Sequence, residues 1–308
     1  MFMSGPLMSF AAESFVQRKV KEIGLQLYTI RDVLNQDARS AIQKVGAIGY
    51  KHVETFYGYK KEETQAKFWG LEVKELKNVL TQNQLKTYSG HYQLNDFLTS
   101  GNGDDSALKY QIDIAAELGQ DYFIEPVPPI MLLDKLGKPE FQYMADQLNK
   151  AGELCAKSKL KVGYHNHFWE FRTLSDGTKG YDTLLSETDP KLVTFEMDLF
   201  WIQKSGLNPV DYFTKYPDRF SMWHVKDMDK NNAASITGGA LDQMPSQEVL
   251  KGISYAEVGT GGINFSDIFK HQADSGLKHI FVEQDVIKID PFTSIKQSFD
   301  YVKQNLIK

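Results

Sequence analysis

Two histidines, an asparagine and a glutamate lie within six positions of the segment LKVGYHNHFWEF, residues 160–171. Imidazole and carboxylate groups bind divalent metals and transfer protons, so this spacing could support metal-assisted acid–base chemistry. The segment begins with an apolar run, residues 160–164, that predicts a buried strand. Side chains alternate faces along a strand, so His165 and His167 are expected on the same side. The segment therefore indicates a strand that leaves the core and ends in a polar site.

Four other segments follow the same progression from apolar to polar residues: TYSGHY, VTFEMD, MWHVKD and IFVEQD. A lone buried histidine is more often a hydrogen-bonded core residue, and a lone acid at a strand end is often a helix N-cap. Because polar residues recur at equivalent positions of five predicted strands, we favour a shared site over these structural roles. The candidate residues at or near such strand ends are Glu54, His91, Glu125, His165, His167, Asp198, His224, Lys226 and Glu283. We assign His52, His271 and His279 to structure.

The elements that must position these groups alternate between short strands and longer helices. Strands are predicted at residues 23–29, 52–56, 85–92, 121–129, 160–164, 192–201, 221–229 and 279–285. Helices are predicted at residues 38–48, 71–83, 104–119, 141–158, 178–188, 208–220, 259–276 and 290–308. Eight strand–helix units are typical of a closed (β/α)₈ TIM barrel, whose active sites lie at the carboxyl ends of the strands. An open doubly wound sheet would normally show a glycine-rich turn after its first strand, where this chain has YTIRDVL.

Composition agrees with one large soluble domain. The chain has 308 residues, 42% hydrophobic and 24% charged, and a net charge of −5 with no basic stripe for nucleic acid. No apolar run reaches the roughly 18 residues that a membrane span requires. We expect an N-terminal extension over residues 1–20 and a single barrel domain over 21–308. If residues 1–13 are the remnant of a signal peptide, the protein is periplasmic; otherwise it is cytoplasmic.

The residues themselves predict a metal centre. Asp198, His224 and Glu283 come from three consecutive strands, and Glu170, His165 or His167 could supply a fourth ligand. Such mixed ligands suit Mn²⁺, Zn²⁺, Co²⁺, Fe²⁺ or Mg²⁺. A bound cation would polarise a carbonyl, so that a nearby base could remove the adjacent proton. Lys226 could then stabilise an enolate oxygen, or simply form a salt bridge with a neighbouring acid.

Five motifs in order, GYHNHFWEF, FEMDLFW, HVKDMD, EVGTGGINF and FVEQD, resemble the sugar phosphate isomerase/epimerase family of xylose isomerase-like barrels. The resemblance covers nearly the whole chain from about residue 21. It implies one divalent metal held by Glu, Asp, His and Glu, which Asp198, His224 and Glu283 match at the last three positions. Several relatives have Glu where this chain has His165. We therefore place Glu170 first in the set, with His165, His167 and Lys226 as catalytic residues.

The resemblance implies a sugar isomerase or epimerase that works through an enediolate. A lyase or dehydratase acting on a keto-sugar or 3-keto-glycoside is the alternative, because it shares the first step. Glu54, His91, Glu125 and Trp201 are predicted substrate contacts. The glycines of GTGGINF could bind an anion or merely form a tight turn. A zinc phosphodiesterase like endonuclease IV is not supported, because such enzymes need several zinc ions and a basic DNA groove. A sugar-binding module without catalysis is compatible with the sequence. So is a homodimer.

Overall fold

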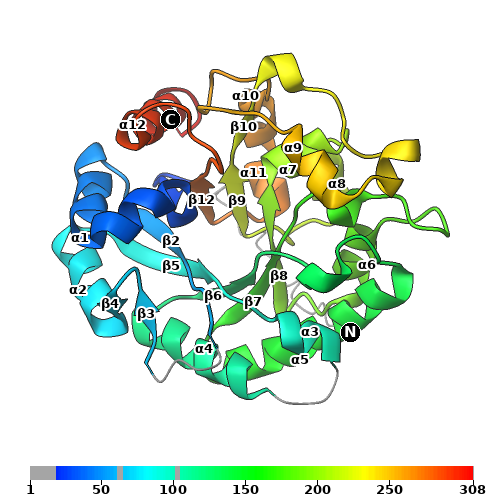
Figure 1. The fold of residues 1–308 in the computed structure, drawn as a ribbon, viewed down its shortest axis with the longest axis horizontal. Helices are drawn as coiled ribbons and strands as arrows, with labels where there is room; N and C mark the ends of the chain where they lie inside the picture. Colours follow the sequence, from blue (N-terminus) through cyan, green and yellow to red (C-terminus); the bar gives the residue numbers. More distant parts are fainter. Residues whose placement is uncertain (1–18, 61–64, 101–104, 308) are drawn as a thin grey trace, which may run out of the picture.

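The computed structural model describes residues 19–60, 65–100 and 105–307. Eight parallel strands close into a barrel in the order β1-β12-β9-β8-β7-β6-β5-β2, with helices around it (Figure 1). The barrel strands are β1 (Gly24–Gln26), β2 (His52–Phe56), β5 (Lys86–His91), β6 (Tyr122–Glu125), β7 (Lys161–His165), β8 (Val193–Asp198), β9 (Met222–Val225) and β12 (His279–Val282). The predicted (β/α)₈ barrel is confirmed.

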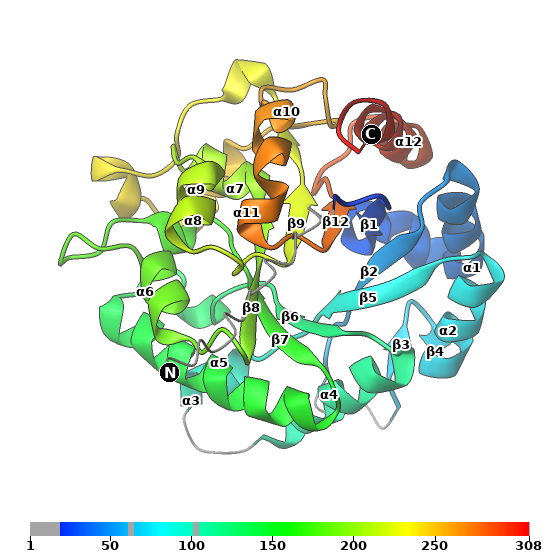
Figure 2. The same cartoon turned by 180° about the vertical axis from the view of Figure 1, so that it is seen from behind.

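Helices cover the outside of the barrel on every side, as the view from behind also shows (Figure 2). The main outer helices are α1 (Arg31–Ile48), α2 (Val73–Gln82), α4 (Ser106–Leu118), α5 (Lys138–Lys157), α6 (Gly180–Glu187), α8 (Pro209–Lys215) and α12 (Pro291–Asn305). Shorter helices are α3 (Asn95–Ser100), α7 (Leu199–Lys204), α9 (Ser246–Lys251), α10 (Phe265–Ile268) and α11 (Gln272–Ser275). Two small hairpins, β3 (Lys67–Phe68) with β4 (Leu71–Glu72) and β10 (Asp227–Met228) with β11 (Tyr255–Ala256), complete the fold.

Helix α5 illustrates why these sequences form this outer layer. Its second residue is Pro139, which suits the first turn of a helix, and the Glu140 side chain accepts a hydrogen bond from the backbone of Gly137. Its buried residues recur every three or four positions, so one stripe of the helix faces the barrel. Cys155 belongs to this stripe and is a buried free thiol. None of the described helices is long and apolar enough to cross a membrane.

Helix α1 begins at Arg31, but its backbone is non-helical at Asp37, so a kink separates a short first part from the predicted helix near residues 38–48. One strand boundary differs from the prediction in a way that matters for the site. Strand β8 ends at Asp198 rather than at residue 201, because the Asp198 carboxylate accepts a hydrogen bond from the Trp201 amide and caps α7. Trp201 therefore lies on a helix. Most of the predicted N-terminal extension, residues 1–18, lies outside the described residues, so its link to export stays a prediction.

The opposite end of the barrel holds two histidines that make no part of the site. The His52 ring packs against the rings of Tyr88, His279 and Phe281, and its Nε2 lies 3.2 Å from the Ile280 carbonyl. Burial lowers the pKa of His52 to about 3 and that of His279 to about 4. Both are therefore neutral in the folded protein, which agrees with their assignment to structure.

Acidification is expected to destabilise the protein through His52. The unfolded chain takes up this proton near pH 6.5, whereas the folded protein resists it down to about pH 3, so stability is lost as the pH falls through that window. Between pH 6.5 and 5 the loss is about 2 kcal/mol. Urea unfolding at both pH values should show this loss in the parent and less of it in His52→Phe. The exposed-site control His271→Ala should keep the full loss, and an unchanged loss in His52→Phe would contradict the assignment.

Candidate metal centre and active site

Four neighbouring strands bring four potential metal ligands together at their carboxyl ends. His165 ends β7, Asp198 ends β8, His224 lies on β9 and Glu283 follows β12. One ligand atom from each of these four buried residues lies within 4.8 Å of the others. The register explains this convergence, since Asp198 is the direct neighbour of His224 across β8 and β9. The side chains therefore form one layer at the end of the barrel interior.

Each histidine presents one ring nitrogen to this layer and the other to a deeper carboxylate. His165 Nε2 lies 3.8 Å from Asp198 Oδ2, and its Nδ1 lies 3.1 Å from Glu196 Oε2. His224 Nδ1 lies 2.8 Å from Glu283 Oε2, and its Nε2 lies 2.7 Å from Glu54 Oε2. Metal-binding histidines are commonly oriented in this way, because a carboxylate on the far nitrogen fixes the tautomer.

The deeper layer consists of Glu54, Glu196 and His91. His91 Nε2 lies 3.1 Å from Glu54 and 3.0 Å from Glu196. Burial alone would lower the pKa of His91, but these two carboxylates raise it to about 10. Gln26 and Ser89 donate further hydrogen bonds to Glu54. This layer supports the two histidines from beneath, although Glu196 Oε1 is buried without a hydrogen-bond partner among the described residues.

The upper layer fits a cation. Asp198 Oδ2 is buried and accepts no hydrogen bond within the described part of the chain. Asp198 Oδ1, by contrast, is occupied by the Trp201 amide, and Asn166 holds the Asp198 backbone through its side-chain amide. Burial raises the pKa of Asp198 to about 6 despite the nearby Lys226. A buried carboxylate oxygen that accepts no hydrogen bond and lies 3.2 Å from Lys226 Nζ, beside two imidazole nitrogens and a second carboxylate, is a suitable environment for a divalent metal.

Lys226 lies among these acids. Its Nζ is 2.7 Å from Glu283, 3.2 Å from Asp198 and 3.1 Å from Asp285. Burial would lower the pKa of Lys226, but the three carboxylates raise it well above its usual value. The salt bridge considered for this residue is therefore present, and Lys226 keeps the neighbouring carboxylates charged.

Glu170 is placed differently from the sequence-based preference. It lies in a short 3₁₀ helix, Trp169–Phe171, that follows β7 and turns the side chain away from the four ligand atoms. One carboxylate oxygen accepts a hydrogen bond from the Tyr164 hydroxyl at 2.6 Å, and the other from the His167 amide at 3.0 Å. Burial raises the pKa of Glu170 to about 7. This placement favours His165 over Glu170 as the fourth ligand.

His167 lies beside the centre with a free ring nitrogen. Its imidazole lies between the rings of Trp169 and Trp201, with centroids 5.0 and 5.2 Å away. Its Nδ1 is buried without a hydrogen-bond partner among the described residues. Burial and the positive charge of Lys226 lower the pKa of His167 well below its usual value. The side chain is thus a neutral imidazole held in place by its aromatic neighbours.

A cavity of about 480 Å³ opens above these groups. His165, His167 and Glu283 line it, together with His91 and Trp201, two of the predicted substrate contacts. Glu54 and Glu125 do not line it. Glu54 lies beneath the histidines, and Glu125 accepts hydrogen bonds from the amides of Leu94 and Val127, while burial raises its pKa to about 8. These positions favour supporting roles for both acids.

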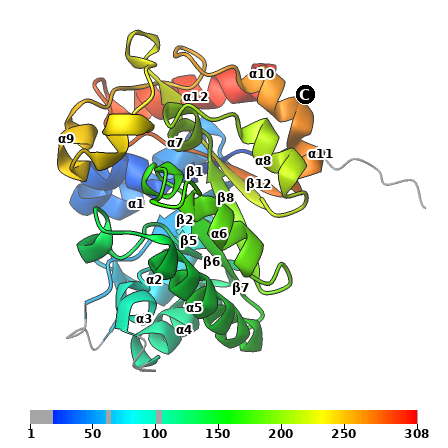
Figure 3. The same ribbon diagram turned by 90° about the vertical axis from the view of Figure 1, so that its right-hand side faces the viewer.

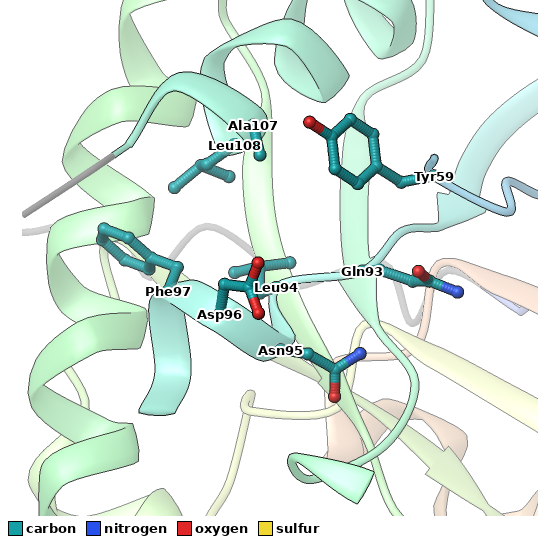
Figure 4. A pocket seen from close by; sticks show the side chains of 8 residues that line it. All are labelled: Tyr59, Gln93, Leu94, Asn95, Asp96, Phe97, Ala107 and Leu108. Carbon is teal, nitrogen blue, oxygen red and sulfur yellow. The ribbon is translucent and has the colours of Figure 1, made fainter. Parts of the chain in front are cut away.

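A smaller cavity of about 250 Å³ lies beside the first and shares Gln93 with it (Figure 4). Tyr59, Phe97 and Leu108 contribute apolar surface to it, and Asp96 is the acid among its lining residues. Its lining contains no histidine. The larger cavity is therefore the candidate active site.

The glycine turn GTGGINF is occupied by the protein's own carboxylate. Asp227 accepts hydrogen bonds from the amides of Gly259, Gly261, Ile263 and Met228 at 2.9 to 3.1 Å. A Cβ atom on Gly261 would lie only 2.4 Å from Asp227 Oδ1, so this position requires glycine. The amides considered for an external anion therefore form a structural turn next to Lys226.

Asp227→Ala is expected to lower the free energy of unfolding by about 3 kcal/mol or more, because it leaves buried amide donors without an acceptor. Chemical denaturation measures this loss. Asp229→Ala is the matched control, since Asp229 is less buried and accepts a hydrogen bond from the Asn231 amide; it should cost about 1 kcal/mol or less. Equal losses in the two variants would contradict the role given to Asp227.

Two site residues, Glu196 and Asp285, were missed by the sequence analysis. Each lies two positions from a recognised residue, Asp198 or Glu283, and the period of two along a strand would have placed Glu196 on the same face as Asp198. Glu196 was overlooked because it lies inside an apolar run.

The fold and the site together define a (β/α)₈ barrel with a candidate metal centre at the carboxyl ends of its strands. The family model for xylose isomerase-like TIM barrels matches residues 42–304, and the chain belongs to this family.

Individual relatives carry more specific names. The chain is 26% identical over 283 residues to an inosose dehydratase of Clostridium botulinum, covering 86% of this chain and 88% of the relative. A sugar phosphate isomerase/epimerase from Parabacteroides distasonis is similar in structure, with a TM-score of 0.77 and 26% identity over 97% of this chain and 99% of the other. A probable 3-DHS dehydratase from Bacillus anthracis has a TM-score of 0.64 at 14% identity, covering 91% of this chain and 98% of the other, which shows the shared fold alone.

Proposed function

We propose that the protein is a divalent metal-dependent enzyme that removes a proton next to the carbonyl group of a sugar or sugar derivative. The observation that carries the proposal is the convergence of four buried ligand atoms, from four neighbouring strands, within 4.8 Å of one another. They lie at the end of the barrel where enzymes of this architecture act, beside a cavity large enough for a sugar.

In this proposal His165, Asp198, His224 and Glu283 hold the cation. Two nitrogen and two oxygen donors suit Zn²⁺, Co²⁺, Mn²⁺ or Fe²⁺ better than Mg²⁺, which prefers oxygen ligands. When bound, the cation withdraws electron density from the substrate carbonyl and so makes the adjacent C–H more acidic.

The chain's own residues perform the remaining tasks. His167 accepts the proton, because its side chain lines the cavity and its imidazole, whose Nδ1 has no hydrogen-bond partner among the described residues, is fixed by two tryptophan rings. Glu196 and Glu54 orient His165 and His224 through their far nitrogens. Lys226 keeps Asp198 and Glu283 ionised, and is thus a positioning residue rather than a substrate contact.

The fate of the enediolate decides between two reactions. The sequence motifs favour isomerisation or epimerisation, and the similarity to a sugar phosphate isomerase/epimerase supports that order. The curated relatives named inosose dehydratase support elimination, since the first of them spans 86% of this chain. We place elimination of a β-substituent first. In that reaction the pair of electrons left by the departing proton forms a C=C bond, and the leaving group departs with its C–O electrons.

Solvent deuterium tests the shared step. Keto-inositols, ketoses and 3-keto-glycosides are incubated in D₂O with protein that has been stripped by a chelator and reloaded with Zn²⁺, Co²⁺, Mn²⁺ or Mg²⁺. We expect at least one substrate to exchange a C–H with the reloaded protein and not with the stripped protein. Product mass then separates elimination from isomerisation, which leaves the mass unchanged. Absence of exchange in all combinations would overturn the proposed function.

A further inference from the structure

The exposed apolar side chains of the described chain gather at one end of the barrel. Eight large hydrophobic residues are exposed, and all lie in segments that follow the carboxyl end of a barrel strand, namely β1, β6, β9 and β12. One of these segments contains α9, which projects on the opposite side of the barrel from α11 (Figure 3). Apolar groups that gather at one place on a protein surface commonly mark a binding region.

Three of the eight residues line the candidate active-site cavity itself. Tyr28, Leu250 and Val286 are 40%, 40% and 53% exposed, and they border the same cavity as His165, His167 and Glu283. Phe56 and Trp169 add aromatic surface to its wall. The cavity thus has a polar, charged floor and an apolar outer part.

The outer part is aromatic on one side. The rings of Tyr28 and Phe56 meet edge to face with centroids 5.3 Å apart. The Arg31 guanidinium lies 4.3 Å from the centre of the Tyr28 ring and donates a hydrogen bond to the Tyr28 carbonyl. Arg31, which also lines the cavity, is therefore a cation held against the aromatic wall.

The size of the cavity exceeds what a single sugar ring requires. A volume of about 480 Å³ corresponds to about 16 water molecules at about 30 Å³ each. A six-carbon sugar has about 12 non-hydrogen atoms, which are packed more closely than separate waters. A sugar seated on the polar floor leaves the outer part of the cavity unfilled.

We propose that the substrate is a sugar that carries an apolar substituent, aromatic or aliphatic, and that this substituent binds against Tyr28, Leu250 and Val286. The proposal rests on the proposed function, since it places the carbonyl of the same substrate at the polar floor. A second copy of this chain could also cover apolar surface at this end of the barrel. The substituent fits the observations better, because these three residues are continuous with the walls of the cavity that holds the candidate catalytic groups.

Pairs of unreactive glycosides test this proposal. Methyl and phenyl β-D-glucopyranoside have no carbonyl group, so the enzyme cannot turn them over; the galactoside and mannoside pairs are measured alongside. Calorimetric titration of the full-length protein gives the Kd of each. We expect at least one pair in which the phenyl glycoside binds about tenfold more tightly than the methyl glycoside, because the ring buries apolar surface.

Leu250→Ser and Val286→Ser should reduce this ratio to about two or less, because they raise the Kd of the phenyl glycoside far more than that of the methyl glycoside. Met131→Ser is the matched control, because Met131 is 77% exposed at the same end of the barrel but does not line the cavity; it should keep the tenfold ratio. A ratio near one in every pair, no binding of any glycoside, or an equal loss in Met131→Ser would overturn the proposal. So would a dimer, seen by sedimentation, that Leu250→Ser dissociates while the ratio stays near one.

The two proposals fail separately. If the protein binds phenyl glycosides more tightly than methyl glycosides but catalyses no deuterium exchange, the apolar binding site is supported and the proposed enzymatic function is overturned. If the protein catalyses deuterium exchange but binds phenyl and methyl glycosides equally well, the proposed function is supported and the apolar subsite is overturned.

Discussion

Replacing His165 by alanine is expected to empty the metal centre, whereas replacing Glu170 by glutamine is expected to leave it loaded. His165 Nε2 lies 3.8 Å from Asp198 Oδ2, which accepts no hydrogen bond among the described residues, but both oxygens of Glu170 are already hydrogen-bonded to Tyr164 and His167. Loss of an outer residue around a metal typically weakens binding about 10- to 100-fold, so loss of the ligand itself should cost at least about 100-fold. Turnover should fall at least in parallel.

Elemental analysis after dialysis, together with chelator competition, measures this difference directly. Both variants need a thermal melt and a circular dichroism spectrum, because each removes a fully or nearly fully buried group. Glutamine has nearly the same size and can still accept one of the two hydrogen bonds through its amide oxygen, so this variant is the milder of the two. A Glu170→Gln protein without metal, beside a His165→Ala protein that retains it, would restore Glu170 as the fourth ligand.

His167→Asn is expected to reduce kcat by about 100- to 10,000-fold while the metal content stays that of the parent. The expected size is that of losing a positioned general base. Asparagine can still form a hydrogen bond at this place, so a role limited to holding a substrate hydroxyl would change KM more than kcat. Steady-state kinetics on the substrate that shows deuterium exchange separates the two roles.

His271→Ala serves as the control for this experiment. His271 is a histidine in a 3₁₀ turn next to α11, paired with Asp274 and remote from the cavity lining, so its loss should not change kcat. Deuterium exchange by His167→Asn at the rate of the parent would exclude His167 as the base. The base would then be another of the groups that line the cavity.

The barrel was predictable because its signals are local and repeated. Each strand is a short apolar run, and each helix has a buried stripe. A chain that alternates such strands and helices can adopt few architectures. The recurring polar residues at strand ends then placed Asp198, His224 and Glu283 in one layer. Parallel neighbouring strands bring equivalent positions together, and the pairing of Asp198 with His224 across β8 and β9 follows that rule.

The position of Glu170 could not be obtained in the same way. Alternation holds only within a strand, and β7 ends at His165. The direction of the next five side chains depends on a 3₁₀ turn and on a hydrogen bond to Tyr164, which are tertiary features. Glu54 presents a related case, because the strand that carries it was predicted correctly. Whether its side chain contacts substrate or supports His224 depends on how deep it lies in the barrel. That depth depends on how the strands are staggered.

The four proposed ligands come from β7, β8, β9 and the residue that follows β12, so the set is complete only after the last barrel strand has been made. Strand β12 pairs with both β9 and β1, so the same strand closes the barrel and delivers Glu283. A nascent chain that has emerged only as far as β9 offers three of the four donor groups and an open sheet. Uptake of a cation by all four proposed ligands is thus expected to follow barrel closure.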